Sequence, residues 1–154
     1  NGAAGLLLIR DRKIMMQHRA PWVHNGDTWG LPGGKSEPSE SLLDTMTREC
    51  QEELGSMPEY LRLVPLEKFT TTDEGFVYHT FFCSVAEEFT PNLNDEHTGY
   101  AWINSGLWPR PMHPGLWSTV NFNAVRNKII HRIFALIKNE TIYQKINKAR
   151  ILIK

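Results

Sequence analysis

Three carboxylates lie along one edge of a predicted helix that runs from Ser39 to about Leu54. Glu49, Glu52 and Glu53 are spaced at i, i+3 and i+4, where helical side chains are neighbours. With Leu42 set at zero and about 100° per residue, Glu53 falls at about 20°, Glu49 at about −20° and Glu52 at about −80°. The apolar side chains fall between about 0° and 120°, and they are Leu42, Leu43, Met46, Cys50 and Leu54. Glu53 is therefore expected within the apolar face.

Two kinds of chemistry could account for these carboxylates. One is a solvated helix face with ion pairs, for which Arg48 and Glu52 are spaced at i, i+4. That explanation suits Glu52 better than Glu53, because a carboxylate turned toward a core is costly unless it is paired. The other is a divalent-cation site, since Mg²⁺ takes one or two carboxylates together with substrate phosphate oxygens. The wheel geometry by itself leaves both interpretations open.

The spacing of these residues extends into a longer motif. Its order is G-x5-E-x7-R-E-U-x-E-E-x-G-U, where U is bulky and apolar, and the matching residues are Gly34, Glu40, Arg48, Glu49, Glu52, Glu53 and Gly55. This stretch resembles the Nudix box, and every fixed Gly, Glu and Arg is present. Cys50 at the first U and Ser56 at the last depart from the pattern without touching its charged positions.

The resemblance implies a fold, an activity and a cofactor. The fold is the Nudix α/β/α sandwich of the α/β class, with a mixed β-sheet and a loop–helix–loop formed by the box. The activity is metal-dependent hydrolysis of a pyrophosphate bond in a nucleoside diphosphate derivative, with Mg²⁺ as the cofactor and Mn²⁺ as the alternative. Carried over to this chain, the metal ligands are Glu49, Glu52, Glu53 and the carbonyl oxygen of Gly33.

Further residues take supporting or catalytic roles in the same resemblance. Glu40 and Arg48 would orient the metal-binding carboxylates by hydrogen bonding. Gly34 would let the backbone approach the metal and the phosphates closely. The general base stays open between a glutamate of the box and one on a later loop, and the candidates are Glu49, Glu52 and Glu96.

Substrate contacts are expected outside the box. A nucleobase needs an aromatic or apolar slot with a few polar groups, and the candidates are Trp22, Trp108 and His113. Lys35 is the candidate contact to a phosphate. Three histidines show no metal-ligand spacing among themselves and are interpreted as structural or solvent-facing: His18, His79 and His97.

Substrate class follows from signatures that the sequence lacks. The proline typical of ADP-ribose hydrolases past the box is missing, because Pro65 lies too close to it. The tyrosine of diadenosine-polyphosphate hydrolases and the Ser-Gln-Pro-Trp array of NADH hydrolases are missing too. These absences favour a MutT-like pyrophosphohydrolase acting on a (d)NTP. The alternatives are hydrolysis of ADP-ribose or another NDP-X, and a nucleotide-binding sensor domain without catalysis.

Residues 30–36, Gly-Leu-Pro-Gly-Gly-Lys-Ser, also suggest a phosphate-binding loop. A Walker A loop requires four residues between its first Gly and the Gly-Lys-Ser ending, whereas three separate Gly30 from Gly34. The chain also lacks a strand ending in the Asp of a Walker B motif. We therefore interpret Gly33-Gly34 as the turn that leads into the box helix.

The elements that must position these residues follow from local patterning. Apolar runs, turn residues and helical periodicity predict strands over Ala3–Arg10, Lys13–Arg19, Trp29–Pro32, Leu61–Thr72, Gly75–Ala86 and Gly99–Ile103, and helices over Ser39–Leu54 and Ser118–Lys138. Ser36–Ser39 supplies the expected cap of the first helix and Gly55 its stop. A turn at Asp73-Glu74-Gly75 is expected to join two strands. We predict one domain over residues 1–138 and a basic, partly amphipathic tail over residues 139–154.

Composition limits the partners. The 154 residues carry 17 Lys+Arg and 17 Asp+Glu, so the zero net charge offers no general attraction to nucleic acid or membrane. An RNA-end hydrolase would need a basic groove, and the basic residues concentrate in the tail alone. Two cysteines without zinc spacing favour a reducing cytoplasm. The expected partner is a nucleotide, with a homodimer left open and neither DNA, RNA nor membrane expected.

Overall fold

A computed structural model describes residues 2–71 and 75–153, and the side chains of residues 2–71, 75–136, 138 and 139. Within these residues the chain forms a seven-stranded sheet and three helices. The strands are β1 (Gly2–Arg10), β2 (Lys13–Arg19), β3 (Trp29–Gly30), β4 (Gly33–Lys35), β5 (Tyr60–Thr70), β6 (Val77–Val85) and β7 (His97–Asn104). The helices are α1 (Leu42–Leu54), α2 (Pro114–Asn121) and α3 (Asn123–Ile153).

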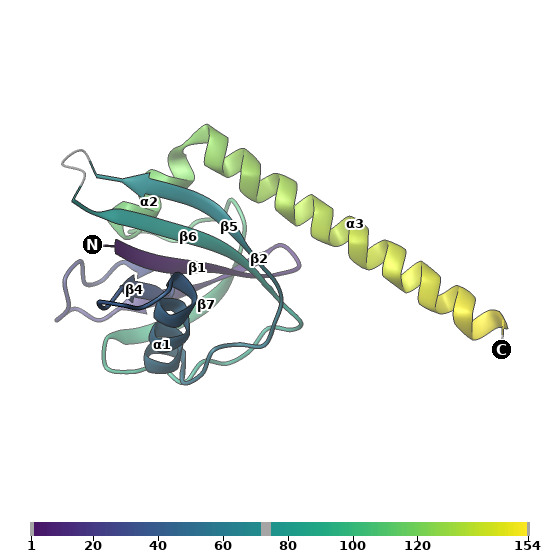
Figure 1. Ribbon diagram of the computed structural model, residues 1–154, viewed down its shortest axis with the longest axis horizontal. Helices are drawn as coiled ribbons and strands as arrows, with labels where there is room; N and C mark the ends of the chain where they lie inside the picture. The colour runs from purple at the N-terminus through teal and green to yellow at the C-terminus, as the bar shows by residue number, and fades with distance from the viewer. Residues whose placement is uncertain (1, 72–74, 154) are drawn as a thin grey trace.

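The sheet is mixed, as expected. Its main path runs β3-β2-β1-β6-β5, with β4 also paired to β1 and β7 paired to β2. β1 and β6 are parallel, in register from Gly2↔Val77 to Ile9↔Ser84, and the other pairs are antiparallel. Figure 1 shows β1 and β6 side by side in the middle of the sheet.

β1 and β2 separate soon after the turn that joins them. They pair at Ile9↔Ile14 and Arg10↔Lys13. Farther along, β4 pairs with β1 and β3 pairs with β2. The sequence predicted a turn at Gly33-Gly34, but the structure has β4 there. A Cβ on Gly33, which has φ 149°, would overlap the backbone of Ala4, so this close pairing requires glycine.

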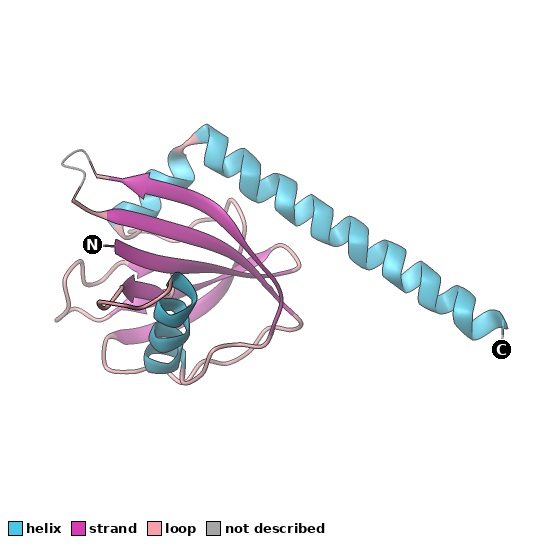
Figure 2. Ribbon diagram, viewed as in Figure 1, coloured by secondary structure: helices cyan, strands magenta, loops and turns pink. Residues whose placement is uncertain are grey.

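The two faces of the sheet carry separate apolar clusters, which confirms the α/β/α sandwich. α1 covers one face, where its Met46 and Cys50 pack with Leu6, Leu8 and neighbouring residues. α2 and the first half of α3 cover the other face, where Val120, Val125, Ile129 and Ile133 pack with Leu7, Ile9 and Phe82. Figure 2 shows α1 in front of the strands and α3 running beyond their edge.

The helix expected over Ser118–Lys138 is two helices. His113 caps α2, Pro114 begins it, and the extended backbone of Phe122 separates α2 from α3. α3 then continues past Lys138 to Ile153, so the segment predicted as a tail prolongs a helix (Figure 1). Apolar residues recur on both sides of the break, and local patterning therefore predicted one helix where the backbone bends.

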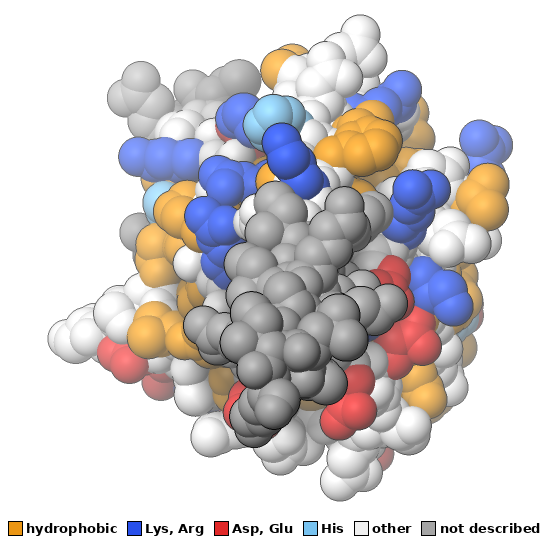
Figure 3. Space-filling model, turned by 90° about the vertical axis from the view of Figure 1, so that its right-hand side faces the viewer, with side chains coloured by type: hydrophobic (Ala, Val, Ile, Leu, Met, Phe, Trp, Pro, Cys, Tyr) orange, Lys and Arg blue, Asp and Glu red, His pale blue; other side chains and the backbone are white. Residues whose placement is uncertain are grey.

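Two expectations fall partly outside what is described. The turn at Asp73-Glu74-Gly75 lies mostly in residues 72–74, and the basic side chains of the tail lie within residues 140–154. Figure 3 shows the face of the molecule toward which α3 points. In this view, Lys and Arg side chains gather in the upper half of the face and Asp and Glu side chains in the lower half. Among the described helices, none has the length and apolar character needed to cross a bilayer.

Candidate active site

α1 is held at both of its ends. Ser41 rather than Ser36–Ser39 is the N-cap, and it forms a capping box with Asp44. Gly55 ends the helix with φ 93°, in the left-handed region, as the sequence predicted. The buried face is turned slightly from the expected stripe, because Leu43 is 47% exposed whereas Thr45 is buried. This small rotation of α1 about its axis places Glu53 near the middle of the buried face.

Glu53 is the most enclosed carboxylate of the box. Its side chain is 4% exposed, which confirms its expected direction. The N–H of Gly33 donates to Glu53 Oε2 at 2.9 Å, and Gln17 Nε2 donates to the Glu53 backbone carbonyl at 3.4 Å. Burial, together with the nearby charges of Glu49 and Glu96, raises the pKa of Glu53 to about 8, and the Gly33 N–H opposes this shift. A positive charge at this point would relieve the cost of burial.

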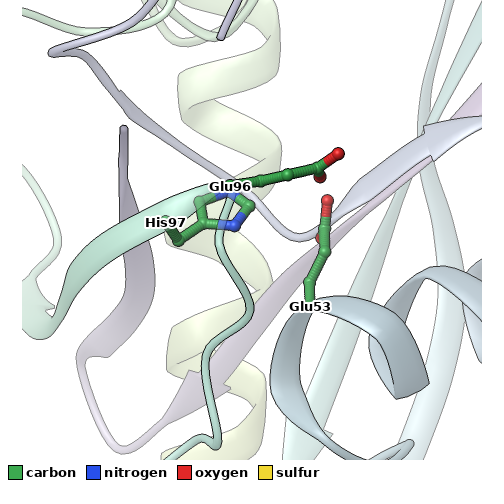
Figure 4. A group of neighbouring side chains, drawn as sticks. All are labelled: Glu53, Glu96 and His97. Atoms are coloured by element: carbon green, nitrogen blue, oxygen red, sulfur yellow. The ribbon is translucent and has the colours of Figure 1, made fainter. Parts of the chain in front are cut away.

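The side chains of Glu96 and His97 lie close to the carboxylate of Glu53. Figure 4 shows the two glutamates and the imidazole close together, Glu53 from α1, Glu96 from the end of the loop before β7 and His97 from the first position of β7. One potential ligand atom from each side chain lies within 4.8 Å of the other two. The backbone supports this loop, since Ala20 N–H donates to the Glu96 carbonyl at 2.8 Å and Glu96 N–H donates to Asn94 Oδ1 at 3.2 Å.

His97 is buried, and its interpretation as a structural or solvent-facing residue missed its place beside two glutamates. Burial, assisted by Arg19 and His18, lowers the pKa of His97 to about 4. The imidazole is therefore neutral at physiological pH and has a nitrogen lone pair to offer. Its position directly after Glu96 was the signal in the sequence that could have drawn attention to it.

Arg48 organises the other side of the helix. It donates to Glu40 at 2.8 and 3.0 Å, to Glu49 Oε1 at 2.9 Å and to the Lys35 carbonyl at 2.8 Å. The contact with Arg48 lowers the pKa of Glu40 to about 2. Burial raises the pKa of Glu49 despite the same arginine. A Cβ on Gly34 would overlap the Glu49 carboxylate, so Gly34 makes room for that side chain.

A family model described as the NUDIX domain matches residues 1–119. The chain belongs to the Nudix family. It is 36% identical over 124 residues to the "Putative 8-oxo-dGTP diphosphatase 3" of Mycobacterium tuberculosis, covering 74% of this chain and 57% of that protein. It is 32% identical over 89 residues to the nucleoside triphosphatase NudI of Escherichia coli, covering 49% of this chain and 60% of NudI. The chain thus spans less than two thirds of either relative.

Solved Nudix structures share the fold. The Nudix hydrolase RenU of M. smegmatis superposes with a TM-score of 0.64 at 27% identity, covering 89% of this chain and 87% of RenU. The superposition covers most of both chains, so the sandwich described above is the Nudix sandwich.

The other two carboxylates of the box that were predicted to bind metal, Glu49 and Glu52, are more exposed than Glu53. The Glu49 side chain is 13% exposed and bonded to Arg48, whereas Glu52 is 54% exposed and lies 3.6 Å from Arg48 Nη1. Among the described residues, the grouping within 4.8 Å includes Glu53 and Glu96 but neither Glu49 nor Glu52. Their roles as metal ligands remain predictions.

The expected substrate residues come from separate segments of the chain. Trp22 is 71% exposed, and its Nε1 donates to the Asp95 carbonyl at 3.0 Å, which ties the first loop to the loop of Glu96. Trp108 packs against the apolar cluster under α2 and α3. His113 accepts from Gly115 N–H at 3.1 Å as the cap of α2. Lys35 is exposed on β4. Their roles in substrate binding remain predictions.

The donor set suits a divalent cation. Glu53 and Glu96 offer carboxylate oxygens, and His97 offers a nitrogen. Among the side chains that the structure describes, no Lys or Arg forms a salt bridge with the buried Glu53 carboxylate, although the charge of Arg19 lowers its pKa slightly against the effect of burial. A buried carboxylate beside a second carboxylate needs a compensating charge. The residues present therefore fit the metal that the family implies.

Proposed function

We propose that this Nudix chain hydrolyses a pyrophosphate bond in a nucleoside triphosphate, with a divalent metal as cofactor. The observation that carries the proposal is the buried Glu53 carboxylate, which lies beside Glu96 with no basic side chain of the described residues paired to it. A structural carboxylate would be expected on the surface or in an ion pair. The intact Nudix box around Glu53 argues against a binding domain that has lost catalysis.

The residues divide into three tasks. Glu53 on α1 and Glu96 before β7 would hold the metal, with Glu49 and Glu52 on the same helix as Glu53 as further candidate ligands. Arg48 fixes the direction of Glu49 through its bond to Oε1, and Glu40 anchors Arg48 in turn. The metal, when bound, neutralises phosphate oxygens and makes water more acidic. One of the glutamates at the site's edge or loop accepts the proton from the attacking water, and the candidates are Glu49, Glu52 and Glu96.

The substrate class is the finer part of the proposal. Two relatives carry the printed names of an 8-oxo-dGTP diphosphatase and a nucleoside triphosphatase, and both names favour a (d)NTP here. ADP-ribose or another NDP-X is the alternative. We further propose a cytoplasmic location, supported by Cys50 and Cys83, which are both free and buried. Association into a homodimer stays a prediction that analytical ultracentrifugation would test.

A substrate panel with matched variants tests this function. Purified protein is incubated with dNTPs, 8-oxo-dGTP, ADP-ribose, dinucleoside polyphosphates and NADH in Mg²⁺ or Mn²⁺, and the products are identified by mass. We expect a nucleoside monophosphate and pyrophosphate from a triphosphate. Glu53→Gln should reduce kcat by at least about a hundredfold, because it removes the charge that holds the metal.

Glu59→Gln is the matched control, since Glu59 is exposed and lies outside the box. It should retain wild-type turnover. Near-normal turnover by folded Glu53→Gln protein would contradict the assignment of Glu53 as a metal ligand. Nucleotide binding without turnover of any substrate would favour the sensor function instead.

A further inference from the structure

We propose that His97 is a nitrogen ligand of the metal site, and that it makes the site prefer a transition-metal dication such as Mn²⁺ or Co²⁺ over Mg²⁺. The proposal deepens the proposed function, because it concerns the same metal site. It changes the donor set expected from the Nudix box, which consists of oxygens.

A bulge in the sheet directs His97 toward α1. In the antiparallel pair of β2 and β7, His18 lies opposite Gly99, but Arg19 lies opposite His97 because the register shifts between them. Without the shift, Thr98 would face Arg19. Bulges re-aim side chains in this way. Thr98 instead bonds His18, with its Oγ1 2.9 Å from His18 Nδ1. The shifted register therefore places the imidazole of His97, rather than the side chain of Thr98, on the face of the sheet where Glu53 lies.

The surroundings of the ring favour ligation. His97 Nδ1 lies 3.4 Å from Asn94 Oδ1, and this oxygen also accepts the Glu96 N–H. With Asn94 Oδ1 as the acceptor, we assign the hydrogen of the neutral ring to Nδ1, which leaves the lone pair on Nε2. Histidines that bind metals usually donate their other ring N–H to an oxygen in this manner. Asn94 therefore acts as a positioning residue for both His97 and Glu96.

The three side chains differ in exposure, so the candidate metal site is closed on one side and open on the other. Glu53 is 4% and His97 is 7% exposed, whereas Glu96 is exposed. Two buried donors can therefore hold a cation from within the fold, while the side next to Glu96 stays accessible to phosphate oxygens and water. This arrangement combines a fixed nitrogen–oxygen pair with an open coordination side.

Donor chemistry then determines the metal preference. Mg²⁺ favours oxygen ligands and loses water reluctantly, so an imidazole adds little to its binding. Imidazole nitrogen suits the later first-row dications, whose affinity for nitrogen sites rises from Mn²⁺ toward Co²⁺ and beyond. Removing the nitrogen should therefore weaken Mn²⁺ and Co²⁺ binding while leaving Mg²⁺ binding nearly unchanged.

Calorimetry on the full chain tests the preference without any substrate. Mn²⁺, Co²⁺ and Mg²⁺ are titrated into wild-type protein, His97→Gln and the control His131→Gln, which changes an exposed histidine of α3. We expect His97→Gln to weaken Mn²⁺ and Co²⁺ about tenfold or more and Mg²⁺ less than about threefold. His131→Gln should match wild type for all three ions. An equal loss for the three ions in His97→Gln, or no loss, would overturn the proposal.

Electron spin-echo spectroscopy of bound Mn²⁺ supplies a direct readout on wild-type protein, so the test does not depend on a variant that folds. A ¹⁴N modulation from a coordinated imidazole is expected, and it should disappear in His97→Gln protein that still binds Mn²⁺. Bound Mn²⁺ without ¹⁴N modulation in wild type refutes the proposal, even if the protein hydrolyses nucleotides. Conversely, ¹⁴N modulation without turnover of any substrate would refute the hydrolase function and leave this proposal standing.

Discussion

At the scale of single residues, Glu53 carries an unusual electrostatic cost. Its carboxylate is buried against the sheet, and the N–H of Gly33 is a neutral donor. Two further carboxylates, Glu49 and Glu96, raise its pKa through charge repulsion. A neutral hydrogen bond offsets only part of the cost of burying a charge. A bound dication would remove the rest, so the protein should respond differently to pH with and without metal.

In the metal-free protein, Glu53 should lower the free energy of unfolding as pH rises from about 5 to 8. The pKa of Glu53 rises from 4.5 to about 8 on folding, so in this range the folded chain keeps a proton that the unfolded chain has released. The free energy of unfolding should therefore fall by up to about 1.4 kcal/mol per pH unit from this group. Urea unfolding in EDTA at several pH values measures the slope.

Glu53→Gln provides the comparison, because glutamine keeps the size of the side chain but cannot titrate. Its slope over the same range should be more positive than that of wild type, and the difference isolates Glu53 from the opposing contribution of His97, whose pKa is lowered on folding. Parallel slopes for the two proteins would contradict the raised pKa of Glu53. Added Mn²⁺ should stabilise wild type more strongly at pH 8 than at pH 5.

At the scale of elements, the two ends of α1 have different consequences for the site. The N-terminal cap, Ser41 with Asp44, lies three turns away from Glu53. The C-terminal cap, Gly55, follows Glu53 by two residues and has φ 93°. A Cβ on Gly55 would also lie 2.9 Å from Asn92 Cβ. The N-terminus therefore contributes mainly stability, whereas the C-terminus also sets the position of the buried carboxylate.

Ser41→Ala and Gly55→Ala should separate these contributions. Loss of the N-cap should cost about 1 kcal/mol of unfolding free energy and leave kcat unchanged. A side chain in the left-handed region should cost about 1–2 kcal/mol and also weaken metal binding, because the backbone next to Glu53 must shift. Chemical denaturation and metal calorimetry on both variants check this. Unaltered metal affinity in Gly55→Ala would show that the C-cap does not position Glu53.

At the scale of the whole molecule, the two faces of the sheet have different roles. α1 closes one face and brings the carboxylates of the box to the splayed strands β1 and β2. α2 and α3 close the other face with apolar contacts, which include Ile129 and Ile133, and Lys128 of α3 adds an ion pair with Glu67 of β5. The described contacts of α3 with the sheet lie in its first half, and the helix then runs past the sandwich (Figure 1). Together with the predicted domain over residues 1–138, this course of the backbone leads us to expect that the second half contributes little to the stability of the domain.

A chain that ends at Lys138 should unfold at the same denaturant concentration as the full chain and keep its hydrolytic activity. This expectation follows from the predicted domain over residues 1–138. Ile129→Ala is the contrasting change, since Ile129 is 2% exposed, and it should cost about 2–5 kcal/mol. Urea denaturation monitored by tryptophan fluorescence measures both. A truncated chain that is as unstable as Ile129→Ala would place the domain boundary beyond Lys138.

The sequence by itself determined the features that depend on local spacing. Helical periodicity showed that Glu53 faces inward and Glu52 outward, Gly55 marked the end of α1, and alternating or apolar runs located most strands within a few residues. The box spacing predicted the family and the sandwich. These properties depend on residues a few positions apart, where backbone geometry alone decides which side chains are neighbours.

The tertiary structure alone decided which distant residues join the box glutamates. The pairing of β2 with β7 brings Glu96 and His97 to Glu53, and a one-residue register shift turns His97 rather than Thr98 toward α1. Because Gly33 pairs with Gly5, the residues that were expected to form a turn form the strand β4. Register depends on contacts across the whole sheet, and a shift of one residue reverses the face of a side chain. Proximity to Glu96 in the sequence could draw attention to His97, but only the folded chain shows that its imidazole lies beside Glu53.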